Sequence, residues 1–223
     1  LAAWVAAPAA EVLRWSELPP LPDPVGFAAP FAGVTEGALV VAGGANFPQG
    51  SLWAGGPKIW HDRIFLLDAP RGQWREAGRL PRPRAYGVSV TIPEGVLCIG
   101  GSDDRAATAE VWLLRRRGDT VVVETWPSLP APLHYACGAL VGRTVYVAGG
   151  LREFTGAPGR WFYAFDLDAP PGERRWRELP PWPGAPRQTA VAGALDGAFH
   201  LFAGLDLVPG LDGQLERRYL RDA

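Results

Sequence analysis

Four apolar segments of the chain end on a glycine pair or a close equivalent, and this repetition constrains the fold more than any other feature. The first segment, ALVVAGG, ends at Gly43-Gly44, and the later ones end at Gly100-Gly101, Gly149-Gly150 and Ala203-Gly204. Glycine adopts positive φ at no steric cost and lets a neighbouring backbone approach closely. The recurrence therefore predicts several copies of one unit, each with a buried strand that leaves its sheet at the glycines.

Tryptophan marks the same period. Trp15, Trp74, Trp126 and Trp176 each open a Pro-containing segment, at spacings of 59, 52 and 50 residues. Each repeat then continues with a small-residue apolar run, a tight turn, the strand that ends on glycine, and an outer strand. The turns are expected where an acidic or glycine residue begins a short polar pair, because such pairs favour hairpins. The predicted pairs are Glu36-Gly37, Glu94-Gly95, Gly142-Arg143 and Asp196-Gly197.

Four antiparallel strands in about 50 residues, with paired glycines, are typical of a kelch-type β-propeller blade. The sequence therefore predicts an all-β fold that forms one partial propeller over residues 1–223. The fourth repeat stops soon after Gly204, so we expect a piece of a longer propeller with an incomplete last blade. By the tryptophan period, the four blades are expected at about residues 15–73, 74–125, 126–175 and 176–223.

Composition excludes several classes of protein. The net charge is −1, and the basic run at residues 115–117 is typical of a solvated turn, so no nucleic acid partner is expected. No apolar run is long enough to span a membrane. Cys98 and Cys137 lie in apolar runs and are predicted to be buried free thiols, with a disulfide left open. No metal-ligand spacing is present, so no metal is expected. A cofactor is not expected either.

The first residues, LAAWVAAPAA, allow three interpretations. They resemble the small-residue end of a secretory signal, and they are equally compatible with an ordinary N-terminal strand or with a remnant of cloning.

Three stretches of the sequence resemble the sialic acid mutarotases, also called N-acetylneuraminate epimerases. They are residues 43–68, 78–101 and 175–204, and the order of the blades resembles the cyclically permuted branch of the family. The resemblance implies six blades, of which about four are present here, and an isomerase that exchanges the α and β anomers of a sialic acid by general acid–base ring opening. It also implies a small sugar as partner, together with the missing blades of the same polypeptide. A periplasmic or secreted location is the commoner expectation for the family, with a cytoplasmic one as the alternative.

The family's catalytic residues are a Glu that follows Gly at the end of an inner strand and an Arg six residues later. No repeat of this sequence has that pattern. Glu153 and Arg160 are seven residues apart and displaced from the glycine pair, and Glu173 lies in an inter-strand loop. We therefore expect the catalytic pair to lie beyond Ala223 and this fragment to be inactive alone.

Several residues are candidates for substrate binding because of their place in the repeat. Arg84 and Tyr86 match the family's RAYG motif, and an Arg can hold a carboxylate with two hydrogen bonds. The long loop that starts at Asn46 is typical of a functional lid. The full set is Arg84, Tyr86, Arg187, Gln188, Asn46, Phe47, His134 and Trp53. If Arg84, Arg187 and Asn46 converge on one axial pocket, an enzyme is favoured, and if they point outward, the enzyme interpretation loses support.

Each candidate also has a structural interpretation. The arginines could pair with an acid or a carbonyl between blades, Tyr86 could be packing, His134 could be structural, and Trp53 could pin its loop to a neighbouring blade. The corresponding alternative function is a non-catalytic kelch propeller that binds a protein or a glycan. The segment HYAC at residues 134–137 is a weak match to the copper site of kelch oxidases, because adjacent strand residues point to opposite faces.

Overall fold

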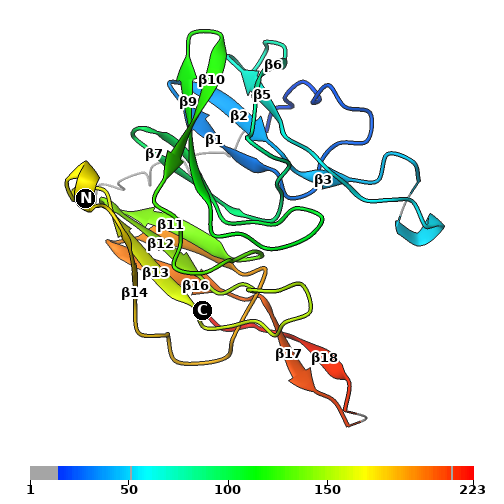
Figure 1. Cartoon of the computed structure of the whole chain (residues 1–223), viewed down its shortest axis with the longest axis vertical. Coiled ribbons are helices and arrows are strands. Elements are labelled where there is room, and N and C mark those ends of the chain that lie inside the picture. The colour runs from blue at the N-terminus through cyan, green and yellow to red at the C-terminus, as the bar shows by residue number, and fades with distance from the viewer. Residues whose placement is uncertain (1–14, 51, 212) are drawn as a thin grey trace, which may run out of the picture.

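The computed structural model describes residues 15–50, 52–211 and 213–223. Strands and short connections make up the structure, with two single turns of 3-10 helix, so the all-β prediction is confirmed. The strands form antiparallel sheets that fan out around one axis (Figure 1). Within the described ranges there is no helix with the length and apolarity that a membrane crossing requires. The segment LAAWVAAPAA, for which the sequence allows three interpretations, lies outside the described residues.

The first three blades are four-stranded antiparallel sheets. Blade one contains β1 (Phe31–Thr35), β2 (Ala38–Ala42), β5 (Arg63–Leu67) and β6 (Arg75–Arg79). Blade two contains β7 (Val88–Ile92), β8 (Gly95–Ile99), β9 (Val111–Arg117) and β10 (Thr120–Trp126). Blade three contains β11 (Cys137–Val141), β12 (Thr144–Ala148), β13 (Phe162–Asp166) and β14 (Trp176–Glu178). The outermost strand of each sheet carries, or directly follows, the tryptophan that opens the next repeat.

Blade four begins with the pair β15 (Val191–Leu195) and β16 (Ala198–Phe202). A separate hairpin of β17 (Leu205–Pro209) and β18 (Leu215–Tyr219) follows. Blade one has a similar excursion after its second strand, with β3 (Ala45–Asn46), the 3-10 turn η1 (Leu52–Ala54) and β4 (Ile59–Trp60). Both excursions project from the same side of the fan in Figure 1. The second 3-10 turn, η2 (Pro171–Glu173), connects β13 to β14.

Three of the four predicted hairpin turns are confirmed, and one is displaced. Glu36-Gly37 and Asp196-Gly197 have positive φ at both residues, as a tight β-hairpin turn requires. The turn at Gly142-Arg143 is also as predicted. In blade two the turn residues are Pro93 and Glu94, while Gly95 already belongs to β8. Proline explains this shift, because its fixed φ suits the first central position of a turn.

The glycine pairs join each blade to the next. Gly43 N donates to Arg63 O in its own blade at 2.9 Å, whereas Gly44 N donates to Arg84 O in blade two at 2.8 Å. A Cβ at Gly43 would lie 2.2 Å from that Arg84 carbonyl, and φ at Gly43 is +65°. Positive φ and the close approach of a carbonyl therefore both require glycine here. The pairs at Gly100-Gly101 and Gly149-Gly150 make the same contacts with Leu133 O and Arg187 O.

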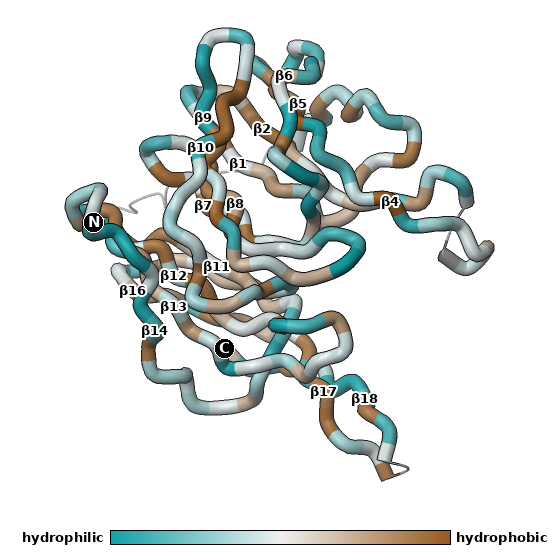
Figure 2. Tube along the Cα trace, viewed as in Figure 1, coloured by the Kyte–Doolittle hydropathy of each residue, from teal (hydrophilic) through white to brown (hydrophobic). Residues whose placement is uncertain are grey.

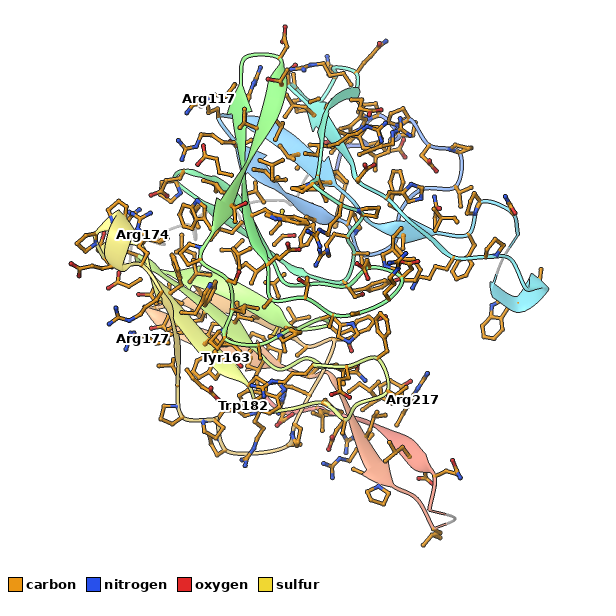
Figure 3. The ribbon with its side chains drawn as sticks, in the orientation of Figure 1. Arg117, Tyr163, Arg174, Arg177, Trp182 and Arg217 are labelled. Atoms are coloured by element: carbon orange, nitrogen blue, oxygen red, sulfur yellow. The ribbon has the colours of Figure 1, made fainter. Side chains whose placement is uncertain are left out.

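The core lies between successive blades. One cluster of buried apolar side chains joins blades one and two, and another joins blades two and three. Figure 2 shows hydrophobic segments along the strands and hydrophilic ones in the turns and loops at their ends. Tyr163, labelled in Figure 3, is fully buried in blade three. The Trp176 indole donates to Pro127 O of the preceding repeat at 2.9 Å, so the tryptophan period also links repeats.

Both cysteines are buried free thiols, as the sequence predicts. Cys98 belongs to the cluster between blades one and two. The Sγ of Cys137 lies 3.6 Å from Ala148 O on the neighbouring strand.

Candidate functional site

Four residues at the entry to the innermost strands are joined in series by backbone hydrogen bonds around the axis. We call this open series the inner ring: Ala29, Tyr86, Tyr135 and Thr189. All four are non-glycine residues with φ between 48° and 61°. Tyr86 N donates to Ala29 O at 3.1 Å, Tyr135 N to Tyr86 O at 2.9 Å, and Thr189 N to Tyr135 O at 2.8 Å. Non-glycine residues at positive φ are uncommon and concentrate at functional sites. The inner ring therefore marks one face of the propeller as the place to look for a site.

A pocket of about 300 Å³ opens beside the inner ring. Its aromatic walls are Trp60, Tyr86, Tyr135 and Phe154. Its polar lining is Lys58, Ser102 and Asp104. These residues come from blades one, two and three, and the volume is in the range of small-ligand sites. Aromatic faces with a few converging polar groups can hold a sugar-sized molecule.

Tyr86 and Tyr135 form the part of the aromatic wall that blades two and three share. Their ring centroids are 4.7 Å apart, at an interplanar angle of 45°. Burial raises the pKa of Tyr86, and burial together with the neighbouring Tyr86 raises the pKa of Tyr135. Both phenols therefore remain protonated at neutral pH and can donate hydrogen bonds.

Lys58 lies against two of the aromatic walls. Its Nζ is 4.2 Å from the ring centroid of Tyr86 and 4.6 Å from that of Trp60, within the range of cation–π contacts. Burial lowers the pKa of Lys58. The pocket thus contains one cation, held in place by aromatic rings.

Ser102 contributes a hydroxyl to the lining of the pocket. Its backbone pairs in both directions with Ala85, which fixes its position at the start of the loop after Gly100-Gly101. The residue is 1% exposed, and its Oγ has no hydrogen-bond partner among the described residues. A buried hydroxyl without a partner is unfavourable unless a ligand or water satisfies it.

His134 lies behind the aromatic wall and does not line the pocket. Its ring is 4.7 Å from Tyr135 and 5.3 Å from Phe154, centroid to centroid. Its Nε2 is 3.4 Å from Glu153 O, and Nδ1 has no partner among the described residues. Burial lowers the pKa of His134, so the imidazole is neutral at neutral pH. His134 forms the isolated β-bridge of its repeat, as Ala85 and Gln188 do in theirs. His134 is therefore equivalent to the residue after Arg84 and not to Arg84 itself.

Arg84 and Arg187 do not converge on the pocket. Each arginine directly precedes the residue that forms the isolated β-bridge of its repeat, Ala85 or Gln188. Arg84 is 1% exposed and Arg187 is 2% exposed. Arg84 Nη2 lies 2.7 Å from Glu110 Oε2, and Arg187 Nη2 lies 2.7 Å from Asp222 Oδ2. The two acids are equivalent, because Gly100 N donates to Glu110 O and Ala203 N donates to Asp222 O. These arginines therefore make ion pairs within blades two and four.

Asn46, Phe47 and Trp53 belong to a second, larger hollow of about 900 Å³ on blade one. Asn46 is fixed there by its own hydrogen bonds, since Nδ2 donates to Gly26 O at 2.9 Å and Oδ1 lies 2.7 Å from His61 Nε2. Trp53 is 92% exposed and touches little of the blade. The hollow is open and mainly apolar, so it offers few groups for orienting a sugar.

The remaining sequence candidates lie apart from the pocket. Gln188 is buried and its backbone pairs with Leu205. The side chain of Arg160 donates to Trp182 O at 3.3 Å, in the segment after β14 where Figure 3 labels Trp182. No ion pair joins Arg160 to Glu153 among the described residues. The structure therefore brings Tyr86 to the pocket, places His134 behind it, and distributes the other candidates elsewhere.

Sequence reasoning missed most of the pocket, because six of its lining residues are not among the eight candidates: Lys58, Trp60, Ser102, Asp104, Tyr135 and Phe154. Two signals were available for this set. Lys58 is the only lysine in the sequence. Ser102 is a polar residue at a position that is Ala45, Leu151 and Leu205 in the other repeats. The described residues contain no cluster of three or more His, Cys, Asp or Glu that could hold a metal ion.

The fold and the inner ring define this molecule as a kelch-type β-propeller with a small polar–aromatic pocket at the axial face. The family model for N-acetylneuraminate epimerase matches residues 3–123, which is more than half of the chain. The chain therefore belongs to the N-acetylneuraminate epimerase family, as the resemblance predicts.

Curated relatives agree with this assignment. An N-acetylneuraminate epimerase of Yersinia pestis (strain Pestoides F) is 36% identical over 142 residues, covering 55% of this chain and 35% of the relative. N-acetylneuraminate epimerase 1 of Escherichia coli O6:H1 is 32% identical over 130 residues, covering 54% and 34%. The chain thus spans about a third of the length of the curated relatives it matches. The solved structure titled "Structure of YjhT" aligns with this chain at a TM-score of 0.64 and 14% sequence identity. The alignment covers 88% of this chain and 70% of the YjhT chain, and it shows a similarity of fold.

Proposed function

We propose that the native polypeptide that carries this sequence is a sialic acid mutarotase, which accelerates exchange between the α and β anomers of N-acetylneuraminate. The observation that carries the proposal is the family match over residues 3–123. The pocket beside the inner ring supports it, because aromatic walls suit the apolar face of a sugar ring and its polar groups suit hydroxyls and a carboxylate.

The chemistry is a pair of proton transfers. The anomeric hydroxyl loses its proton, the bond between the anomeric carbon and the ring oxygen breaks, and the ring oxygen takes up a proton. The open-chain keto acid then closes on the other face of its carbonyl. A general base and a general acid accelerate both steps. In this pocket the protonated Tyr86 and Tyr135 are suited to donate hydrogen bonds to sugar oxygens, and Asp104 is suited to accept from sugar hydroxyls.

The test follows the anomers directly. A sialidase releases α-N-acetylneuraminate from an α-ketoside, and proton NMR then records its conversion to the β anomer with and without the native polypeptide. We expect faster loss of the α signal in its presence. A rate equal to that of the blank contradicts the proposed activity.

A non-catalytic kelch propeller that binds a glycan or a protein is the second candidate. The hollow on blade one favours it, since exposed Trp53 offers a stacking face outside the small pocket. Binding to a glycan array that Trp53→Ala abolishes, without any acceleration of anomer exchange, supports this second function. Acceleration that survives Trp53→Ala favours the mutarotase.

A periplasmic or secreted location is part of the proposal, with a cytoplasmic one as the alternative. The support is the family resemblance and the alanine-rich first residues. Fractionation of cells that express the native polypeptide decides between the two locations.

A further inference from the structure

Lys58 is a lysine in a chain whose other Lys or Arg positions are all arginine. The sequence has 22 Lys and Arg residues, and Lys58 is the only lysine among them. Arginine is the residue that makes the ion pairs described here, as at Arg84 and Arg187. Lysine is a compact point charge on a flexible stem, unlike the planar guanidinium. A single lysine in a pocket therefore points to a role that the abundant arginines do not fill.

The environment of Lys58 lacks a fixed counter-ion. No carboxylate oxygen lies within 4.0 Å of Nζ in the part of the chain that the structure describes. Its neighbours are the faces of Tyr86 and Trp60. The nearest acid of the pocket lining, Asp104, has a side chain that is 67% exposed and lies 3.9 Å from Arg105. The pocket thus holds a partly buried cation that no protein carboxylate neutralises.

Ser102 provides a second, independent observation that points to a ligand. Its hydroxyl lines the same pocket, the residue is 1% exposed, and Oγ has no partner among the described residues. A cation and an unpaired hydroxyl in one small cavity match the needs of a carboxylate, which accepts hydrogen bonds on two oxygens.

We propose that Lys58 receives the carboxylate of the sugar, with the Ser102 hydroxyl as a second donor, so that the pocket selects sugar acids over neutral sugars. The inference rests on the proposed function, because it concerns the substrate of the same site. Lys58 is a binding residue here and takes no part in proton transfer. The rings of Tyr86 and Trp60 position the ammonium.

The experiment compares two ligands that differ in one charge: N-acetylneuraminate and its methyl ester. Reductive methylation of the native polypeptide with carbon-13 formaldehyde labels lysine and keeps its positive charge. The signal that is missing from the Lys58→Gln variant identifies Lys58. We expect the acid to shift this signal in a saturable way and the ester to leave it in place. A signal that neither ligand moves, or that both move equally, overturns the proposal.

Affinities measured by calorimetry give the matched control. Loss of a charge-assisted contact predicts that Lys58→Gln weakens binding of the acid about 10-fold or more and leaves the ester unchanged. Arg82→Gln removes a positive charge that is 57% exposed and outside the pocket lining, and it is expected to change neither affinity. Equal weakening by both variants overturns the proposal, because it indicates a general electrostatic effect.

The outcome is separable from that of the proposed function. If the acid shifts the Lys58 signal but anomer exchange is not accelerated, the carboxylate site stands and the mutarotase activity fails. If exchange is accelerated and Lys58→Gln binds the acid as tightly as the wild type, the activity stands and the role of Lys58 is wrong.

Discussion

Tyr86 and Tyr135 are joined twice at the boundary between blades two and three. The N–H of Tyr135 donates to the carbonyl of Tyr86 at 2.9 Å, and their rings lie 4.7 Å apart above this bond. This hydrogen bond of the inner ring therefore also brings two aromatic walls of the pocket together. Any change in how these two blades pack is transmitted to the site.

The contribution of the Tyr86 hydroxyl can be measured separately from that of its ring. Tyr86→Phe keeps the ring contact, so we expect the free energy of unfolding to change by less than about 0.5 kcal/mol. Loss of one hydrogen bond to the sugar predicts a fall of about 10-fold in the rate of anomer exchange. Tyr146→Phe is the control, because Tyr146 stacks on Phe162 and Phe199 away from the pocket. Equal rates for the wild type and Tyr86→Phe contradict a role for this hydroxyl.

Glu110 neutralises an arginine that is 1% exposed. Glu110→Ala leaves the Arg84 guanidinium buried without its acid, and we expect a loss of about 2–4 kcal/mol in urea unfolding. Arg82 pairs with the same Glu110 at 3.4 Å but is 57% exposed, so Arg82→Ala is expected to cost less than about 0.5 kcal/mol. Similar losses for both variants indicate that burial of Arg84 does not govern this interaction.

Gly100 and Gly142 separate close approach from backbone conformation. Both have positive φ, 62° and 58°. A Cβ at Gly100 lies 2.3 Å from Leu133 O, whereas nothing lies within 4 Å of one at Gly142. We expect Gly142→Ala to cost about 1 kcal/mol from the left-handed conformation, and Gly100→Ala to cost at least about 2 kcal/mol more because the blades must separate. Thermal unfolding of the two variants measures this difference. Equal decreases in unfolding temperature contradict this view of the glycine pairs.

The two thiols are expected to be unreactive in the folded protein. Burial raises the pKa of Cys137 to about 12 and raises the pKa of Cys98 well above its ordinary value. Since the thiolate is the reactive form, a disulfide reagent at about pH 8 should modify neither in the native state and both after unfolding in guanidinium. Rapid labelling without denaturant contradicts the burial of these residues.

His134 predicts a loss of stability in mild acid. Burial lowers its pKa below the ordinary 6.5, and the same holds for His61. The unfolded chain therefore binds protons first as pH falls below about 6.5, so the contribution of each neutral imidazole is complete above that pH and is lost as pH falls through the folded pKa. We expect His134→Gln to flatten part of this dependence, measured as unfolding free energy against pH. His200→Gln is the control, and an unchanged profile for His134→Gln contradicts the prediction.

The candidate site was predictable only in part, and the arginines show why. Arg84 and Arg187 looked like pocket residues because they stand at the start of an inner strand beside motif residues. Their partners Glu110 and Asp222 lie outside the strands, 26 and 35 residues further on. No sequence pattern near the arginines indicates these acidic partners, so the ion pairs of the two buried side chains could not be predicted.

The sequence alone determined the unit of this protein. Glycine pairs, tryptophans and turn residues act through local backbone conformation and short-range packing, so their period was enough to predict an all-β kelch-type propeller and most of its turns. Tertiary structure decided the pocket. Lys58, Ser102 and Tyr135 belong to three different blades, and they meet only because the inner ring holds the entries of the innermost strands together. Contacts between residues far apart in the chain depend on how whole blades dock, and no local pattern records that geometry.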